Sequence, residues 1–241
     1  MPLISLISEN RFAKYDHLKK EDVLTKLSSC INNPSGYKLN SDAFSPLSGN
    51  LKHSKIVEAF KPLDIELVKQ LKVNNQFSAF LKGKYGNNIS NKGDELFTTI
   101  DDLVIRRNDI AHGTPIDNIL NITEFDEYLE FLENYGKAIF ETIVEKEIQY
   151  EATYLYTKIA NIKGVYKKGS VLCFEIENHR IETGDYIIIQ TPEKYFIKKE
   201  ILEIQENNIT SDRLDITSKT DIGVNLGDGV TKNQIFYIKA R

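Results

Sequence analysis

The chain has 241 residues, of which 41% are hydrophobic and 27% charged, so it can form one large or two ordinary domains with a sizeable core. Its formal net charge of −4 excludes a strongly basic surface over the whole protein. Its two cysteines, Cys30 and Cys173, lie far apart without a CxxC partner or nearby histidines, so we expect no zinc site and a reducing compartment.

The first part of the chain has the pattern of a helical protein. It begins with MPLISLISEN, which lacks the positive start and long apolar core of a signal peptide. No later apolar run is long enough to span a membrane, so we expect a cytoplasmic protein with no membrane partner. Apolar residues at three- and four-residue steps predict a helix over residues 11–31, which breaker residues 33–36 close.

Further helices are predicted up to about residue 160. Residues 54–73 have helical spacing, with Pro62 either kinking the helix or opening a new one, and residues 83–91 are expected to form a loop. Residues 94–112 carry an apolar stripe at helical spacing. A last helix is expected to start at Thr123, with Asp126 completing a capping box, and its stripe continues to Ile159. So long a helix is expected to break or bend, near Gly136 or around Glu151.

After residue 161 the pattern changes to short β-rich runs separated by turn residues. These runs cover residues 171–176, 186–189, 194–204, 221–226 and 234–239. Many short strands at this spacing predict a small barrel or sandwich. The expected fold class is therefore multidomain, with an α-helical bundle in residues 1–160 followed by a small antiparallel β-barrel in residues 161–241.

The charges are unevenly distributed within the helical part. Between Lys52 and Lys92 there are eight lysines against three acids, whereas between Thr114 and Glu151 there are ten acids against two lysines. Both stretches are explained by solvated helical faces. The alternative is that the basic stretch contacts phosphates, which makes Lys52 and Lys55 candidate RNA-binding residues.

One short stretch, Arg107-Asn108-Asp109-Ile110-Ala111-His112-Gly113, carries the candidate chemistry. Gly113 suits the left-handed position that ends a helix, so His112 lies against unsatisfied carbonyls that favour an imidazolium. Arg107 falls on the apolar stripe, where a charge needs a partner. Two interpretations are open: Arg107 pairs with an acid and His112 only caps the helix, or the stripe is a dimer seam that brings two copies of the pair into one cleft.

This stretch resembles the R-x4–6-H motif of HEPN-domain ribonucleases, in the form with Asn after Arg and Ala-His-Gly at the end that toxin and defence proteins carry. The resemblance implies a helical bundle over about residues 1–150 and metal-independent RNA cleavage in a homodimer. It implies that Arg107 binds the scissile phosphate, that His112 is the acid or base, and that Asn108 orients groups or contacts the ribose. Arg106 is a candidate secondary phosphate ligand.

The resemblance also implies the partners and the biological role. RNA is the expected substrate, with tRNA and rRNA as candidates, and a toxin or anti-phage defence role brings in an antitoxin or regulatory protein. Some HEPN toxins carry a tyrosine two residues after the histidine that is nucleotidylated; Thr114 stands there, which removes that form of neutralisation. The alternative function is a non-catalytic dimer that binds RNA or a translation factor.

The remaining features point to no other chemistry. The sequence has no P-loop, GxGxxG, GxSxG or HExxH motif, so we expect no metal and no cofactor. His17, His53 and His179 are expected on the surface or in structural roles, with His53 as a further candidate for RNA contact. Residues 181–187 and 222–232 resemble the second domain of elongation factor Tu-like translation factors, which implies a barrel that helps to choose RNA; a protein-binding or merely structural barrel is the alternative.

Overall fold

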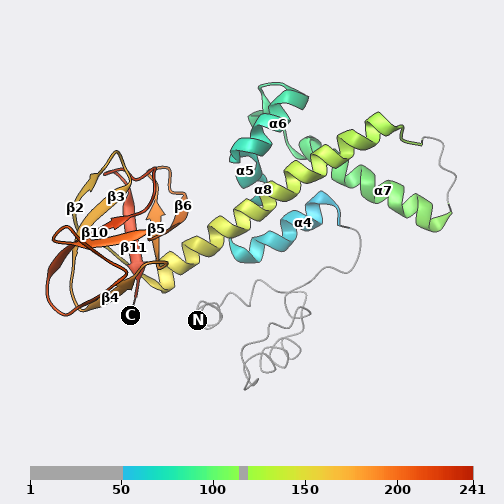
Figure 1. Cartoon of the computed structure of the whole chain (residues 1–241). Coiled ribbons are helices and arrows are strands. Elements are labelled where there is room, and N and C mark those ends of the chain that lie inside the picture. The colour runs from blue at the N-terminus through green and yellow to red at the C-terminus, as the bar shows by residue number, and fades with distance from the viewer. Residues whose placement is uncertain (1–50, 114–118, 241) are drawn as a thin grey trace, which may run out of the picture. The chain divides into compact units, whose positions relative to one another are not determined.

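The computed structural model describes residues 51–113 and 119–240, and the predicted helix over residues 11–31 lies outside them. A helical region is followed by antiparallel sheets (Figure 1), as the sequence predicts. By their contacts the described residues separate into two compact units, divided between Thr142 and Ile143 inside the last helix. A domain boundary at residue 160 therefore stays a proposal, based on where the secondary structure changes.

The helical unit is built from short helices and one long one. Their bounds are α4 His53–Phe60, η2 Lys61–Leu63, α5 Leu67–Val73, α6 Asn75–Tyr85, η3 Ile89–Asn91, η4 Asp94–Phe97, α7 Thr98–His112 and α8 Ile122–Tyr154. Pro62 lies in the first turn of η2, and Asp64 ends η2 in a left-handed conformation, so the predicted helix over residues 54–73 is interrupted. The sequence pattern did not reveal α6, whose start is capped by the Asn74 side chain accepting from the Phe77 N–H at 2.9 Å.

An aromatic cluster forms the core of this unit. The rings of Phe131 and Tyr135 on α8 each lie 5.9 Å from the ring of Phe77 on α6, measured between centroids. All three side chains are buried, together with Phe97 before α7. Leucines of α5 and α6 complete the same core. The core therefore holds the middle of α8 against α5, α6 and the start of α7.

The long helix differs from its prediction at both ends and in the middle. Its capping box is formed by Asn121 and Glu124, not by Thr123 and Asp126: the Asn121 N–H donates to Glu124 Oε2 at 2.8 Å, and the Glu124 N–H donates to Asn121 Oδ1 at 3.0 Å. α8 runs unbroken past Gly136 to Tyr154. A helical glycine costs only about 1 kcal/mol relative to alanine, which a long helix with a buried face tolerates.

Eleven strands follow in the described residues. Their bounds are β1 Tyr156–Lys158, β2 Asn161–Tyr166, β3 Val171–Ile176, β4 His179–Glu182, β5 Tyr186–Gln190, β6 Phe196–Glu200, β7 Glu203–Glu206, β8 Ile209–Ser211, β9 Arg213–Ile216, β10 Thr220–Asn225 and β11 Ile235–Lys239. The predicted single strand over residues 194–204 is two strands, β6 and β7, because the chain leaves the sheet at the buried Ile201.

The strands form three antiparallel sheets around one core. Their orders are β1-β11-β5-β6, β2-β3-β10-β7-β8 and β4-β9. Strands of all three sheets contribute to the core, as Phe236, Phe174 and Ile181 do. The sheets are not joined into a closed ring of hydrogen bonds, and the arrangement is of the barrel-like class that the strand spacing predicts.

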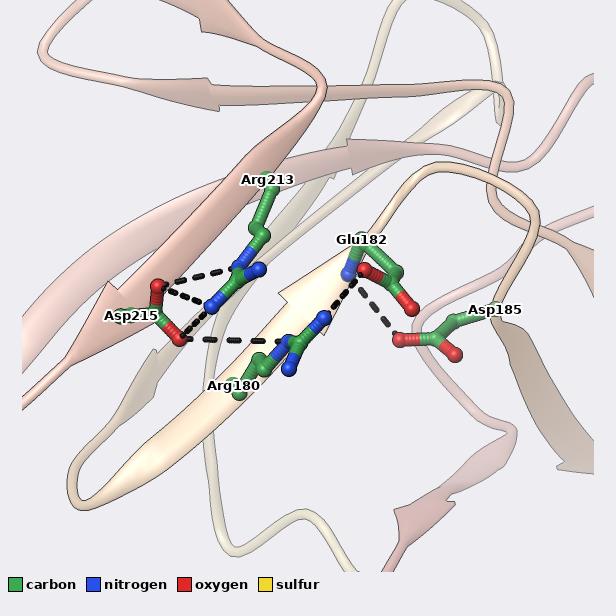
Figure 2. A network of polar contacts seen from close by, with 5 residues as sticks. All are labelled: Arg180, Glu182, Asp185, Arg213 and Asp215. Atoms are coloured by element: carbon green, nitrogen blue, oxygen red, sulfur yellow. Dashed lines mark hydrogen bonds and ion pairs between the residues drawn. The ribbon is translucent and has the colours of Figure 1, made fainter.

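The small ribbon of β4 and β9 carries a group of charged side chains (Figure 2). Both guanidinium groups reach Asp215: Arg213 Nη2 lies 2.8 Å from Oδ2, and Arg180 Nε lies 3.9 Å from Oδ1. Arg180 Nη2 also donates to Glu182 Oε2 at 3.0 Å. Of these side-chain contacts, only the one between Arg180 and Asp215 joins the two strands, and exposed ion pairs of this kind contribute little to stability.

Candidate active site on α7

The carboxyl-terminal half of α7 carries the residues of the predicted site. Gly113 follows the last helical residue with φ 68° and ψ 24°, and its N–H bonds to carbonyls of the preceding turn. This is the left-handed helix end that the sequence predicts, and only glycine adopts it without steric cost. His112 therefore occupies the last turn of α7 and is exposed.

Of the three predicted catalytic residues, Arg107 and Asn108 contact each other, and His112 lies on another face of α7. Arg107 Nη1 donates to Asn108 Oδ1 at 3.3 Å, so the amide lies beside the guanidinium. Five helical residues rotate by about 140° and rise by about 7.5 Å, so Arg107 and His112 project from different faces of α7. One chain therefore presents its arginine and its histidine in different directions.

The predicted apolar stripe of α7 becomes more exposed toward the end of the helix. Ile100 is 6% exposed, Leu103 and Val104 are half-buried, and Ala111 is exposed. Arg107, which shares this stripe, has an exposed side chain within one chain. Ile110, three residues after Arg107, adds an apolar side chain that is 64% exposed on the same side of the helix.

Arg106 faces α8 and takes part in a polar cluster. Its Nε donates to Asp102 Oδ2 at 2.6 Å, and the Tyr128 hydroxyl of α8 donates to the same oxygen. Burial opposes the ionisation of Asp102, but the bonds from Tyr128 and Arg106 outweigh it and hold the pKa of this carboxyl below its ordinary value. The cluster ties α7 to α8 one helical turn before Arg107.

The two candidate lysines lie near the other end of α7. Lys55 pairs with Glu58 at 2.7 Å on the exposed side of α4, and Lys52 is the exposed residue before that helix. The start of α4 is anchored to the first turn of α7, because the His53 N–H donates to Asp101 Oδ1 at 2.8 Å. Asp101 precedes His112 by about 16 Å of helix, so one chain does not bring these lysines to its own histidine.

The expectation that His53 contacts RNA is wrong, because its side chain is only 3% exposed. The imidazole stacks on Phe97 with centroids 3.8 Å apart, and its Nδ1 is bonded to the Tyr135 hydroxyl at 3.0 Å. The structural role that the sequence also allowed for His53 is the one observed.

Among the described residues no three His, Cys, Asp or Glu side chains gather as metal ligands.

A second apolar face on α8 is exposed beside this site. Its members share one side of the helix, at steps of three or four residues and then a step of eight across Gly136: Ile122, Phe125, Leu129, Leu132 and Phe140. Ile122 is 82% and Phe140 is 66% exposed. We call these five residues the α8 stripe. It lies apart from the α8 face of Phe131 and Tyr135, which is buried in the core.

Sequence reasoning missed two parts of this region. The Asp102–Arg106 pair was detectable, because its four-residue spacing is typical of a helical ion pair, but its contact with Tyr128 depends on how α7 and α8 cross. The spacing of apolar residues also predicts a single stripe on α8, in which the exposed Leu129 and Leu132 are grouped with the buried Tyr135. Only the packing of α8 shows that the exposed and the buried residues form two faces.

A helical domain whose late helix ends in Arg-Asn-x3-His-Gly defines the class of HEPN-domain proteins. The chain belongs to the RiboL-PSP-HEPN family, whose match covers residues 2–145. HEPN domains act on nucleic acid, often as ribonucleases and typically as dimers, and the group also has members without catalytic activity. A search of curated proteins gives no match. No helix among the described residues has the length and apolar character needed to cross a membrane.

Proposed function

We propose that the protein is a metal-independent endoribonuclease that works as a homodimer, with Arg107, Asn108 and His112 as its catalytic residues. The observation that carries this proposal is that the exposed Arg107, bonded to Asn108, and the exposed His112 lie within the last two turns of α7. Family membership supports an RNA substrate.

The reaction that these residues suit is attack of a ribose 2′-OH on the adjacent phosphorus. The attacking hydroxyl loses a proton, the P–O bond to the 5′ oxygen breaks, and that oxygen takes up a proton. The products are a 2′,3′-cyclic phosphate and a 5′-OH. His112 carries one of the two proton transfers, and Arg107 holds the charge that builds on the phosphate oxygens through its fork of N–H donors.

The exposed apolar side chains of α7 and α8 support the proposed dimer. Arg107 and His112 of one chain point about 140° apart, so a second chain supplies the missing half of a compact site. The α8 stripe and the exposed Ile105 and Ile110 offer the apolar area that such a contact needs. We propose a second copy as the occupant of the α8 stripe; residues 1–50 of the same chain are the other occupant to test.

Cleavage is tested with purified protein, total RNA and EDTA, by detecting fragments that end in 2′,3′-cyclic phosphate. We expect His112→Ala to lower the rate by about 10²–10⁴-fold, and Arg107→Ala by about 10²–10³-fold. Both variants should keep the unfolding temperature of the natural protein, because the replaced side chains are exposed.

Arg213→Ala is the matched control, since it removes an exposed arginine from the β4–β9 ribbon. It should leave the cleavage rate unchanged. Full activity in both His112→Ala and Arg107→Ala would refute the assignment. Binding of RNA without any fragments would support the alternative, a non-catalytic dimer that recruits RNA or a translation factor.

We further propose a toxin or anti-phage defence role, with tRNA or rRNA as the target and an antitoxin or regulatory protein as partner. The support is the form of the motif, with Asn108 after the arginine and Gly113 after the histidine. Expression of the natural chain should then arrest growth of a bacterial host, whereas the His112→Ala chain at equal abundance should not. Equal growth of the two strains would contradict the toxin role.

A further inference from the structure

A cleft in the β unit lies outside the proposed active site and has a defined lining. Its volume is about 430 Å³. It is bounded by the β1–β2 connection, the end of β3, the start of β4, the residue before β10 and the end of β11. Five separate segments of the unit therefore converge on one hollow.

Three lysines from three of these segments line the cleft: Lys158 of β1, Lys219 before β10 and Lys239 of β11. We call this hollow the lysine cleft. All three side chains are exposed, and none forms an ion pair with a described residue. By contrast, Lys163, Lys198 and Lys199 of the same unit each pair with a carboxylate at 2.6–3.3 Å.

The carboxylates of the lining do not cancel this charge. Glu175 is engaged from outside the cleft by Lys163 Nζ at 3.1 Å, and it accepts from the Asn161 amide at 3.0 Å. Its pKa is held below the ordinary value by Lys163 first, and Asn161 and Lys219 add to the effect. Glu177 is the remaining acid of the lining. Three lysines and two glutamates therefore line the cleft, and one of the glutamates, Glu175, is already bound by Lys163.

The size and the other lining groups narrow the ligand. A volume of about 430 Å³ lies within the range of small-ligand sites and exceeds what a bare phosphate fills. Asn161 and the half-buried His179 add hydrogen-bonding groups beside the lysines. This combination suits one nucleotide, with its phosphate on the lysines and its sugar or base on the polar wall.

We infer that the lysine cleft binds a nucleotide unit of single-stranded RNA, as a contact separate from the cleavage site on α7. The inference rests on the proposed function for its choice of RNA over a free nucleotide, which shares the same chemistry. A site of this kind holds the substrate strand without taking part in its cleavage.

The test uses the full chain with His112→Ala, so that RNA is bound and not cut. The probes are a fluorescent single-stranded RNA of about 12 nucleotides and fluorescent AMP, followed by polarisation at several salt concentrations. The test variant adds Lys158→Gln, Lys219→Gln and Lys239→Gln. The matched control adds Lys232→Gln, which removes an exposed lysine of the same unit outside the cleft.

The triple variant should bind RNA more weakly and lose about 0.7 from the slope of log affinity against log salt, the value for one phosphate contact to a single strand. The control should match the parent. If AMP binds as tightly as the RNA and its binding also depends on the three lysines, the cleft binds a free nucleotide, and the choice of RNA as its ligand is wrong. Unchanged affinity and slope for both probes in the triple variant overturns the inference.

The outcome is separable from that of the proposed function. If RNA binding depends on the three lysines but the natural chain does not cleave RNA, the binding site in the lysine cleft is supported and the proposed ribonuclease function is contradicted. If the natural chain cleaves RNA but RNA binding is the same with and without the three lysines, only the binding site in the lysine cleft is contradicted.

Discussion

Single side chains in this protein have roles that their neighbours decide, and His53 is the clearest case. It stands between Lys52 and Ser54 in a basic stretch, yet its ring is buried against Phe97 and bonded to Tyr135. Its Nε2 has no hydrogen-bond partner among the described residues. A neutral ring tolerates this environment, whereas an imidazolium would place a second N–H donor there without an acceptor.

This burial predicts how stability depends on pH. Burial lowers the pKa of His53 below its ordinary value, and the nearby Asp94 and Asp101 offset only part of the effect. The unfolded chain then binds the proton more readily than the folded chain. The free energy of unfolding should fall as the pH drops through about 6.5, by at most about 1.4 kcal/mol per pH unit from this residue, and level off below the folded pKa.

The measurement is urea unfolding between about pH 7.5 and about pH 5, with His53→Gln as the comparison, since glutamine has no charge to gain in this range. The natural chain should show the steeper loss. Parallel curves for the two proteins would show that His53 does not titrate as its burial requires.

At the scale of elements, α8 has two apolar faces, and among the described residues only one of them is buried. Phe131 and Tyr135 are buried, whereas Leu129 is 48% and Leu132 is 39% exposed. The sequence predicts one continuous stripe, because periodicity reports apolar spacing and not which face is covered. A helix that is apolar on two sides needs two partners, and the core supplies one.

A charge placed on the α8 stripe should therefore break the proposed dimer. Leu129→Asp should shift the protein from dimer to monomer in size-exclusion chromatography with light scattering, because an unpaired carboxylate is costly to bury. It should also lower cleavage, while circular dichroism stays unchanged. Lys137→Gln is the control: it changes the net charge equally on an exposed position outside the stripe.

Two results would contradict this account of the stripe. A natural chain that is already monomeric would mean that residues 1–50 or another partner cover the stripe. A Leu129→Asp variant that remains dimeric would place the contact elsewhere.

The elements also show what sequence reasoning can reach. The end of α7 at Gly113 and the strands β3, β5, β10 and β11 were predictable, because a left-handed glycine and alternating β-branched runs are local signals. The interruption at Pro62 was also predictable, because proline favours the first turn of a new helix. The helix α6 and the short strands β8 and β9 were not located. Their positions depend on packing around Phe77 and Ile216 in the two cores, which no local pattern reports.

At the scale of the whole molecule, the sequence could predict which residues belong to the candidate site, but not how these residues lie relative to one another. The Arg107–His112 pair follows from the motif, and the contact between Arg107 and Asn108 is local. The separation of Lys52 and Lys55 from His112 follows from how α4 crosses the start of α7. This separation and the angle between Arg107 and His112 are the basis of the proposal that two chains form one site.

The central claim is that one active site takes its arginine and its histidine from different chains. A heterodimer of Arg107→Ala and His112→Ala chains, purified through two different tags after co-expression, tests this directly. It retains one natural arginine and one natural histidine on opposite chains. We predict that it cleaves RNA at least about a hundredfold faster than either mutant homodimer. A heterodimer as inactive as both homodimers would contradict a site shared between chains.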